Sequence, residues 1–310
     1  MTLRFTVLAS GSAGNASVIQ TDGFGVLLDA GIGPRVLASR LVAAGLSWQS
    51  IHACLLTHTH TDHWNDRTFA QFLRREIPVY CHDDHHDELL NLSESFADLR
   101  SAGMVRDYSP RRELVLSPAL RCRALPLRHD SGATFGFRFE STTELYGPSA
   151  AIGYVADLGC WSEELVAALL DLDLLALEFN HDIALEKRSD RHPRLIARVL
   201  SDDGHLSNEQ AANLLREVLR RSTPGRLRHL VQLHLSRECN RPALALTAAQ
   251  GVVGDHDGTI TIHTASQAEA GPTLHLTGTA TRRPKRRSAA KKAIAECDSP
   301  QLCLPGLEMA

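Results

Sequence analysis

Residues 57–63 read Thr-His-Thr-His-Thr-Asp-His and carry three imidazoles and one carboxylate within six positions. Imidazole nitrogens and carboxylate oxygens are the ligands that suit zinc, and also manganese or iron, at roughly 2.0–2.2 Å. A solvated polar loop with unrelated histidines is the alternative, and a lone His-x-His pair would not separate the two interpretations. The density of ligand types in this segment predicts a metal site.

The mostly apolar run at residues 51–56 positions this segment. It predicts a buried strand that ends where the histidines begin. Because side chains alternate along a strand and spread apart on a loop, His58 and His60 are able to converge on one ion. Asp62 and His63 can then turn toward a second ion.

The pattern His-x-His-x-Asp-His at residues 58–63, preceded by Leu-Leu-Asp-Ala-Gly at residues 27–31, resembles the signature of the metallo-β-lactamase superfamily. That family places further ligands later in the chain, each just past a strand. His129, Asp157 and His234 follow apolar runs of strand type in the required order. Each of them alone could be an ordinary hydrogen-bonded side chain at a strand end, so the ordered set is what indicates metal binding.

The resemblance implies a dinuclear site. The ligands it implies are His58, His60 and His129 for one ion and Asp62, His63 and His234 for the other, with Asp157 bridging both. Asp29 is expected to orient the loop that carries the histidines rather than to bind metal, since metal ligands need supporting hydrogen bonds. The expected cofactors are two divalent metal ions, Zn²⁺ first and Mn²⁺ as the alternative.

Two ions of this kind activate water and offset the charge that develops on an ester, a lactam or a phosphodiester, so the substrate class must come from other residues. A histidine at position 60, where redox di-iron relatives carry a glutamate, favours a hydrolase. His63 gives the second site only nitrogen and oxygen ligands, whereas enzymes of this fold that open β-lactams usually vary at that position. The resemblance therefore disfavours both redox chemistry and antibiotic hydrolysis.

Residues 204–208, Gly-His-Leu-Ser-Asn, predict a turn into a helix. In phosphodiesterase branches of the superfamily, such as RNase Z, a His-Ser at this place follows a strand that ends in an acidic residue and contacts the scissile phosphate. The strand ending near Glu178 and the residue His205 match this arrangement, so His205 is expected to stabilise or protonate the leaving oxygen. The alternative is structural, because Ser207 and Gln210 form a capping box.

Four segments resemble the YycJ (WalJ) group of this superfamily: residues 8–15, 180–182, 204–208 and 234–242. Members of the group are regarded as DNA exonucleases that act from the 5′ end, and the resemblance covers roughly residues 3–265. It implies a dinuclear phosphodiesterase acting on DNA, in which His205 balances charge and Asp157 or Asp62 orients the nucleophile. A small-molecule hydrolase of the same fold, such as a thioesterase or cyclic phosphodiesterase, and a non-catalytic adaptor remain as alternatives.

Short loops are expected to hold the strand, because the spacing of the ligands leaves no room for the long arm of RNase Z or the cap domain of RNase J relatives. The candidate segments are residues 81–110 and 183–194. Four cations in the second segment could pair with phosphates or form a solvated loop: Lys187, Arg188, Arg191 and Arg194. The histidines and aspartates at residues 82–87 are expected to cap and start a surface helix rather than to bind a further metal.

The composition is that of a soluble enzyme, with 310 residues of which 43% are hydrophobic, enough for one large core or two small ones. No apolar run approaches the roughly 18 residues that cross a bilayer, and residues 1–5 enter a strand without a signal-peptide pattern. We therefore expect a cytoplasmic protein with no membrane partner. The seven cysteines, without a Cys-x-x-Cys pair, suggest neither a disulfide framework nor a thiolate zinc site.

The apolar periodicity predicts an α/β domain over residues 1–265. Strands are expected at 3–8, 16–20, 25–29, 51–57, 77–80, 121–127, 134–139, 151–156, 173–178, 228–233 and 258–263. Helices are expected at 34–44, 66–75, 83–101, 162–170, 191–200, 208–220 and 242–250. The resemblance adds the architecture of an αββα metallo-β-lactamase sandwich, two sheets face to face with helices outside and the metals at one edge.

The composition changes after residue 265. Large apolar side chains are few in residues 266–310, and seven basic residues fall within positions 282–292, so we expect a disordered basic tail. The whole chain carries −3 and these eleven positions carry +7, so the remaining residues sum to −10. The basic run would attract a phosphate backbone without reading its sequence, or would serve only as a solvated linker.

The segment Gln301–Leu307 resembles the short peptide by which bacterial replication and repair proteins bind the sliding clamp. In that peptide a glutamine is followed by spaced leucines that fill an apolar pocket. Gly306, just before the last leucine, departs from the tightest form of the pattern. The sequence thus suggests two partners, nucleic acid for the folded domain and a sliding clamp for the tail.

Overall fold

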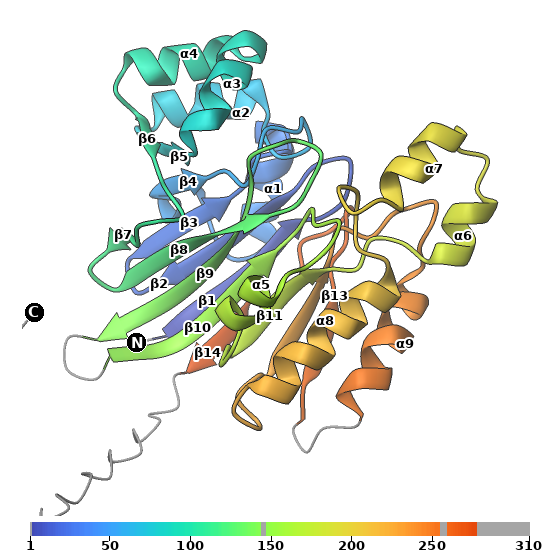
Figure 1. The fold of residues 1–310 in the computed structure, drawn as a ribbon. Coiled ribbons are helices and arrows are strands. Elements are labelled where there is room, and N and C mark those ends of the chain that lie inside the picture. The colour runs from blue at the N-terminus through green and yellow to red at the C-terminus, as the bar shows by residue number, and fades with distance from the viewer. Residues whose placement is uncertain (1, 144–146, 255–258, 278–310) are drawn as a thin grey trace, which may run out of the picture. The chain divides into compact units, whose positions relative to one another are not determined.

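Two seven-stranded sheets form the centre of the structure, a computed structural model that describes residues 2–143, 147–254 and 259–277 (Figure 1). The first sheet has the strand order β14-β1-β2-β3-β4-β5-β6. Its strands are β1 (Thr2–Ala9), β2 (Ala16–Thr21), β3 (Phe24–Leu28), β4 (Ala53–Leu55), β5 (Val79–Cys81), β6 (Val105–Asp107) and β14 (Leu274–Thr277).

The second sheet has the order β13-β12-β11-β10-β9-β8-β7. Its strands are β7 (Leu114–Ser117), β8 (Leu120–Leu127), β9 (Thr134–Thr143), β10 (Gly147–Val155), β11 (Leu174–Glu178), β12 (His229–Leu233) and β13 (Thr261–Thr264). Strands β10 to β13 run parallel to one another, whereas β7 to β10 are antiparallel neighbours. The carboxyl ends of β10, β11 and β12 therefore meet at one edge.

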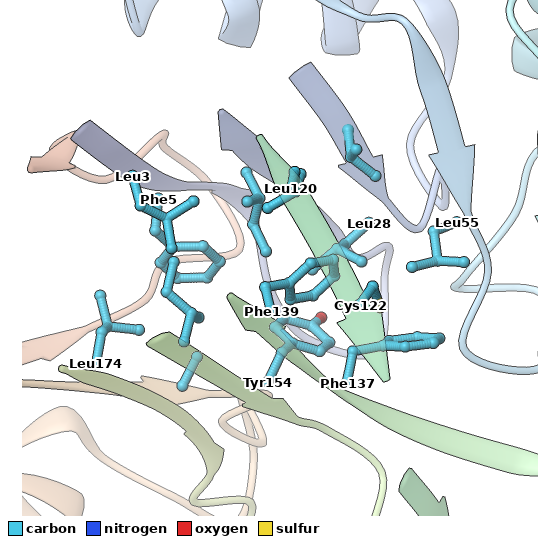
Figure 2. Close-up of a cluster of buried hydrophobic side chains, with 14 of the residues drawn as sticks. Leu3, Phe5, Leu28, Leu55, Leu120, Cys122, Phe137, Phe139, Tyr154 and Leu174 are labelled. Atoms are coloured by element: carbon cyan, nitrogen blue, oxygen red, sulfur yellow. The ribbon is translucent and has the colours of Figure 1, made fainter. Parts of the chain in front are cut away.

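One extensive apolar core lies between the two sheets. Leu3, Phe5 and Leu28 of the first sheet pack against Phe139 and Tyr154 of the second, and Figure 2 shows these side chains filling the space between the strands. In β10, Ile152 and Tyr154 belong to this core while Ala151 and Val155 belong to the core beneath the helices. This alternation is the period of two that a strand covered on both faces requires.

Helices cover the outer face of each sheet (Figure 1). The first sheet packs against α1 (Pro34–Ala43), α2 (Asp66–Arg74), α3 (His86–Leu92) and α4 (Glu94–Ser101). The second sheet packs against α5 (Glu163–Ala168), α8 (Asn208–Arg221) and α9 (Pro242–Val253). Short 3-10 turns occur at Trp48–Ser50 (η1) and Asp83–His85 (η2). The αββα sandwich expected from the sequence is confirmed.

Two further helices, α6 (Ile183–Arg188) and α7 (Pro193–Val199), belong to neither layer (Figure 1). Within them only Glu186 and Val199 are buried. From the sequence, a loop was expected at 183–194 and a helix at 191–200. Asp182 explains the extra helix, since its side chain accepts a hydrogen bond from Leu185 N and caps α6.

The single helix expected at 83–101 is divided into η2, α3 and α4. Ser93 ends α3 and caps α4, because its hydroxyl accepts a hydrogen bond from Phe96 N and donates one to Asp66. The expectation that residues 82–87 cap and start a helix is confirmed, since the His82 side chain accepts a hydrogen bond from Asp84 N. Strands β6 and β7 were not expected from the sequence.

The boundary expected at residue 265 must move. Strand β14 lies beyond it and pairs antiparallel with β1, with Leu276 opposite Leu3. The reason is burial, because Leu274 and Leu276 enter the core between the sheets. The basic run at 282–292 and the clamp-like segment 301–307 lie outside the described residues. No helix among the described residues is long and apolar enough to span a bilayer.

The role of β14 can be tested with Leu276→Ala. Leu276 is fully buried, so the substitution should lower the free energy of unfolding by about 2–5 kcal/mol. Its neighbour His275 is exposed, and His275→Ala should change stability by about 0.5 kcal/mol or less. Equal urea midpoints for the two variants would contradict the assignment of β14 to the folded core.

His85 gives a prediction about pH. Burial lowers the pKa of His85 from 6.5 to about 4, and its Nε2 donates a hydrogen bond to Ala133 O at 2.7 Å while Nδ1 accepts one from His82 N. The unfolded chain binds a proton here between pH 6.5 and about 4 and the folded chain does not, so stability falls with acidity in that window by up to about 1.4 kcal/mol per pH unit.

His85→Gln removes this titration and keeps a donor and an acceptor. Urea unfolding at pH 5.0 and 7.5 should show a smaller acid loss for His85→Gln than for the wild type. The exposed His275→Gln serves as control and should follow the wild type. A wild-type acid loss in His85→Gln would show that this histidine does not resist protonation.

Candidate metal centre

The sequence-predicted ligands all follow strands whose ends meet at one edge of the sandwich. The loop after β4 carries the 58–63 segment, and His129, Asp157 and His234 follow β8, β10 and β12. The backbone turns sharply at these ends, because Asp157 and His234 have φ angles of 58° and 55°. This left-handed conformation costs roughly 1–2 kcal/mol for most residues and is commonest among non-glycine residues for Asn, Asp and His.

The first cluster consists of His58, His60 and His129. Each offers a ring nitrogen, and the three ligand atoms lie within 4.8 Å of one another. His129 Nδ1 donates a hydrogen bond to Gly204 O at 2.8 Å, which turns His129 Nε2 toward His60. His58 and His129 are buried, and His60 is partly exposed.

The second cluster consists of Asp62, His63 and His234, again with one ligand atom each within 4.8 Å. Asp62 Oδ2 lies 3.6 Å from His63 Nε2 and 3.3 Å from His234 Nε2. Asn15 Nδ2 donates a hydrogen bond to the same oxygen at 3.1 Å. Burial alone would raise the pKa of Asp62, but His63 and His234 lower it to about 2.

Asp157 lies between the two clusters. Its Oδ2 is 3.0 Å from His63 Nε2, and its Oδ1 is 3.6 Å from His234 Nε2 and 4.0 Å from His129 Nε2. Asp157 also forms a possible ligand group with His58 and His63. The structure thus brings all seven sequence-predicted side chains together, with Asp157 between the two clusters.

The donor set fits divalent metal ions. His58 Nε2 is buried and has no hydrogen-bond partner among the described residues. Burial, followed by the nearby His63, lowers the pKa of His58 well below its usual value, so this imidazole is neutral and keeps a free lone pair. Burying a polar nitrogen without a hydrogen-bond partner costs free energy. The cost is offset when the nitrogen's lone pair binds a metal ion.

Asp29 supports the centre from behind. It is fully buried and accepts hydrogen bonds from Thr57 N at 2.9 Å and from His63 Nδ1 at 2.8 Å. His63 is therefore held with Nε2 facing Asp157. Close packing of the loops needs Gly31, because a Cβ there would meet Asp62 O at 1.7 Å. The geometry agrees with the orienting role expected for Asp29.

His205 lies beside both clusters. Its ring centroid is 4.9 Å from that of His129 and 5.2 Å from that of His234. Its Nδ1 donates a hydrogen bond to Glu178 Oε1 at 2.8 Å and lies 3.6 Å from Asp157 Oδ1. Burial is the largest single influence and lowers the pKa of His205, but the carboxylates of Glu178 and Asp157 together outweigh it, so the net shift is upward.

The capping box of Ser207 and Gln210 is also present at the start of α8. The structural and the chemical interpretations of residues 204–208 are therefore compatible, since the box fixes the backbone turn that presents His205. Glu178, named at sequence level only as a strand end, is the residue that holds the ring. Its Oε2 accepts hydrogen bonds from Leu158 N and Leu206 N, which fixes the carboxylate.

Neighbouring residues of the segment 180–182 lie in different surroundings. Asn180 Nδ2 donates a hydrogen bond to His234 O at 2.9 Å and lies at the centre. His181 is buried and lines a different groove, between α6, α8 and α9. Of the four cations expected to hold phosphates, Arg191 lines the cleft above the metal centre, and Lys187 lines the other groove.

Asp130 was not expected from the sequence. Its Oδ1 lies 3.4 Å from His129 Nε2 and 3.6 Å from His60 Nε2, and its Oδ2 accepts a hydrogen bond from Arg198. Its position directly after His129 was the one feature of the sequence that could have pointed to it. Its partner Arg198 lies 68 residues further along the chain.

An open cleft of about 670 Å³ leads from solvent to the centre. Its lining residues are Ser12, Thr59, His60, Thr61, Asp62, Glu88, Leu92, Asp157, Asn180, Arg191, Leu195, Arg198, Val199, His205, His234, Ser236 and Glu238. Helices α3 and α7 contribute to its walls. Both expected substrate-holding segments, 81–110 and 183–194, therefore reach the cleft.

Known proteins share this fold. The model of the beta-lactamase superfamily domain matches residues 25–226. The exodeoxyribonuclease YycJ of Bacillus anthracis is 26% identical over 259 residues, which cover 82% of this chain and 90% of that protein. The exodeoxyribonuclease WalJ of Streptococcus pneumoniae is 26% identical over 247 residues, which cover 78% of this chain and 85% of that protein.

A solved structure agrees on the architecture. The metallo-β-lactamase fold protein YhfI from Bacillus subtilis aligns with a TM-score of 0.63 at 18% identity, over 89% of this chain and 100% of that chain. At this identity the likeness supports the fold alone. The resemblance to the YycJ (WalJ) group seen in the sequence is confirmed by the relatives. The chain belongs to the beta-lactamase superfamily and is a hydrolase of the metallo-β-lactamase fold, a family whose site implies divalent metal ions.

Proposed function

We propose that this hydrolase is a dinuclear phosphodiesterase that degrades DNA from the 5′ end. The observation that carries the proposal is the pair of ligand clusters with Asp157 between them and His205 beside both, at an open cleft. Two relatives that match most of their own length are named exodeoxyribonucleases, which supports DNA as the substrate. An open cleft also suits a polymer better than an enclosed pocket would.

The seven predicted side chains have defined roles in this proposal. His58, His60 and His129 would hold one cation, Asp62, His63 and His234 the other, and Asp157 both. Zinc suits this nitrogen and oxygen set, and manganese is the alternative. Two bound divalent cations supply a nucleophile from water at neutral pH and neutralise charge on the phosphoryl oxygens.

The chain's own residues then control protons. Asp62 is partly exposed and lines the cleft, so Asp62 or Asp157 can orient the attacking water by accepting its hydrogen bond. Glu178 occupies Nδ1 of His205 and leaves Nε2 as the ring nitrogen available to substrate. When His205 is protonated, Nε2 carries a proton that it can donate to the departing oxygen. An alkoxide is a poor leaving group unless it receives such a proton.

The metal assignment predicts metal content. Elemental analysis should find two equivalents of divalent metal per wild-type chain, and clearly less after Asp157→Ala, because this carboxylate contacts both clusters. Asp98→Ala, an exposed change on α4, should retain both equivalents. Chelation should lower the Tm of the wild type, because it removes metal ions that stabilise the folded state by binding to it. A reconstituted wild type that binds no metal would instead support the adaptor alternative.

The substrate assignment predicts digestion with polarity. On 5′-labelled single-stranded DNA, the wild type should release label in very short products at early times, while 3′-labelled strands shorten gradually. His60→Ala should reduce the rate about 100-fold or more because it removes a metal ligand, whereas the exposed His275→Ala should leave it unchanged. RNA, duplex DNA, a thioester and a cyclic phosphodiester complete the panel.

Two results would overturn the assignment. Equal digestion by the wild type and His60→Ala would identify the activity as a contaminant. Turnover of the thioester or cyclic phosphodiester with no cleavage of any strand would identify a small-molecule hydrolase of the same fold.

A further inference from the structure

The cleft above the metal centre needs cations to hold a polyanion, and arginines 191 and 198 are the cationic side chains in its lining. Four carboxylates also line it: Asp62, Glu88, Asp157 and Glu238. Two of them, Asp62 and Asp157, belong to the ligand clusters. The two arginines differ in how their donors are used.

Arg191 is committed to the protein. Its Nη1 contacts the fully buried Glu186 at 3.1 Å, its Nε contacts Glu238 at 2.7 Å and its Nη2 donates to Ser236 Oγ at 3.2 Å. A buried carboxylate needs such a partner, because leaving it unpaired is costly. Arg191 therefore fastens the segment between α6 and α7 to the loop after β12.

Arg198 is available. Its side chain is 50% exposed, and Asp130 Oδ2, which accepts from Nε, is its one hydrogen-bond partner among the described residues. Both terminal nitrogens are therefore free. The planar guanidinium presents these donors in a fork that matches two oxygens of a phosphate.

The contact with Asp130 fixes the position of the Arg198 guanidinium. Its other oxygen lies 3.4 Å from His129 Nε2 and 3.6 Å from His60 Nε2, so one carboxylate separates the guanidinium from the first ligand cluster. A phosphate at Arg198 would thus lie next to a phosphate at the metal centre, not at the same position. Leu195, one turn earlier on α7 and 38% exposed, offers an apolar surface to the cleft beside the guanidinium.

We propose that Arg198, positioned by Asp130, forms a subsite for the backbone phosphate adjacent to the one being cleaved in a single DNA strand. The inference rests on the proposed nuclease function and adds to it a binding residue on α7. Phosphate contacts of this kind set the register of a strand without reading its sequence.

Strand binding by the metal-loaded protein tests the proposal. The probe is a single-stranded phosphorothioate oligonucleotide that resists cleavage, titrated at several KCl concentrations. Arg198→Ala should weaken binding about tenfold or more, as expected for a lost charge-assisted contact. It should also reduce the slope of log affinity against log salt by about 0.7, the value for one phosphate contact on a single strand.

The matched control is Arg220→Ala. Arg220 is an exposed arginine on α8 that also has a single carboxylate partner, Glu217, and it lies outside the cleft lining. Its removal should change the affinity by no more than about twofold. Arg198→Lys keeps the charge without the fork and should fall between the wild type and Arg198→Ala.

Two further readouts separate a subsite from a structural role. Turnover of bis(p-nitrophenyl) phosphate, which has a single phosphate and cannot occupy the adjacent subsite, should fall far less in Arg198→Ala than strand binding does, and should be unchanged in Arg220→Ala. Asp130→Asn should weaken strand binding in the wild type but cause no further loss in the Arg198→Ala background, because the two residues act as one unit.

The failures are distinguishable. If the wild type cleaves DNA and Arg198→Ala binds like Arg220→Ala, the subsite is overturned while the nuclease function stands. If Arg198→Ala loses small-diester turnover together with strand binding, the arginine acts on the metal centre and the subsite is likewise overturned. A wild type that neither binds nor cuts any strand overturns the nuclease function and the subsite with it.

Discussion

The site depends on one buried interaction, that of the Asp157 carboxylate with the imidazoles of three histidines on separate loops. Burial is the largest single influence and raises the pKa of Asp157, but His234, His63 and His58 together outweigh it, so the group remains ionised in an almost water-free position. A buried charge is tolerated only when its partners surround it, so the loops that carry those partners must fold together. The same carboxylate lies within reach of both ligand clusters, which is why the two clusters form one centre.

The scaffold meets this demand by bringing strand ends to one edge. Parallel neighbours β10, β11 and β12 deliver Asp157, Glu178 and His234 to the same edge, and the first sheet delivers Asp29 and the histidine loop from the other side. Asp29, Asp157 and His234 all have positive φ angles, between 55° and 58°. Backbone strain of this kind persists where the surroundings over-determine it, and here the surroundings are the hydrogen bonds of the centre.

Carboxylates next to the centre orient the histidine rings by hydrogen bonding. Asp29 accepts a hydrogen bond from Nδ1 of His63 and Glu178 accepts one from Nδ1 of His205, so in both rings Nε2 is the nitrogen left for the centre. The α6–α7 segment buries little apolar surface, and polar contacts of Arg191 and Arg198 help to hold it to the sandwich. Polar contacts thus hold this wall of the cleft, whereas the apolar sandwich beneath it holds the loops that carry the candidate ligands.

The sequence alone determined what depends on local pattern. The ligand types at residues 58–63, the apolar runs before His129, Asp157 and His234, and the alternation along β10 are all readable within a few neighbouring positions. These features predicted an α/β domain and a metal site at residues 58–63, and the family resemblance that they carry implied the αββα sandwich and the seven ligands. The capping of α8 by Ser207 was readable for the same reason.

Only the tertiary structure decided the pairings between distant residues. Asp130 and Arg198 are 68 positions apart, and Glu178 and His205 are 27 apart, so no local pattern predicts either contact. Strand β14 looked like the start of a tail because four residues carry too weak a periodicity, and it became a strand because β1 offers it a free edge and an apolar core. Long-range burial and hydrogen bonding, which a linear pattern does not contain, made these choices.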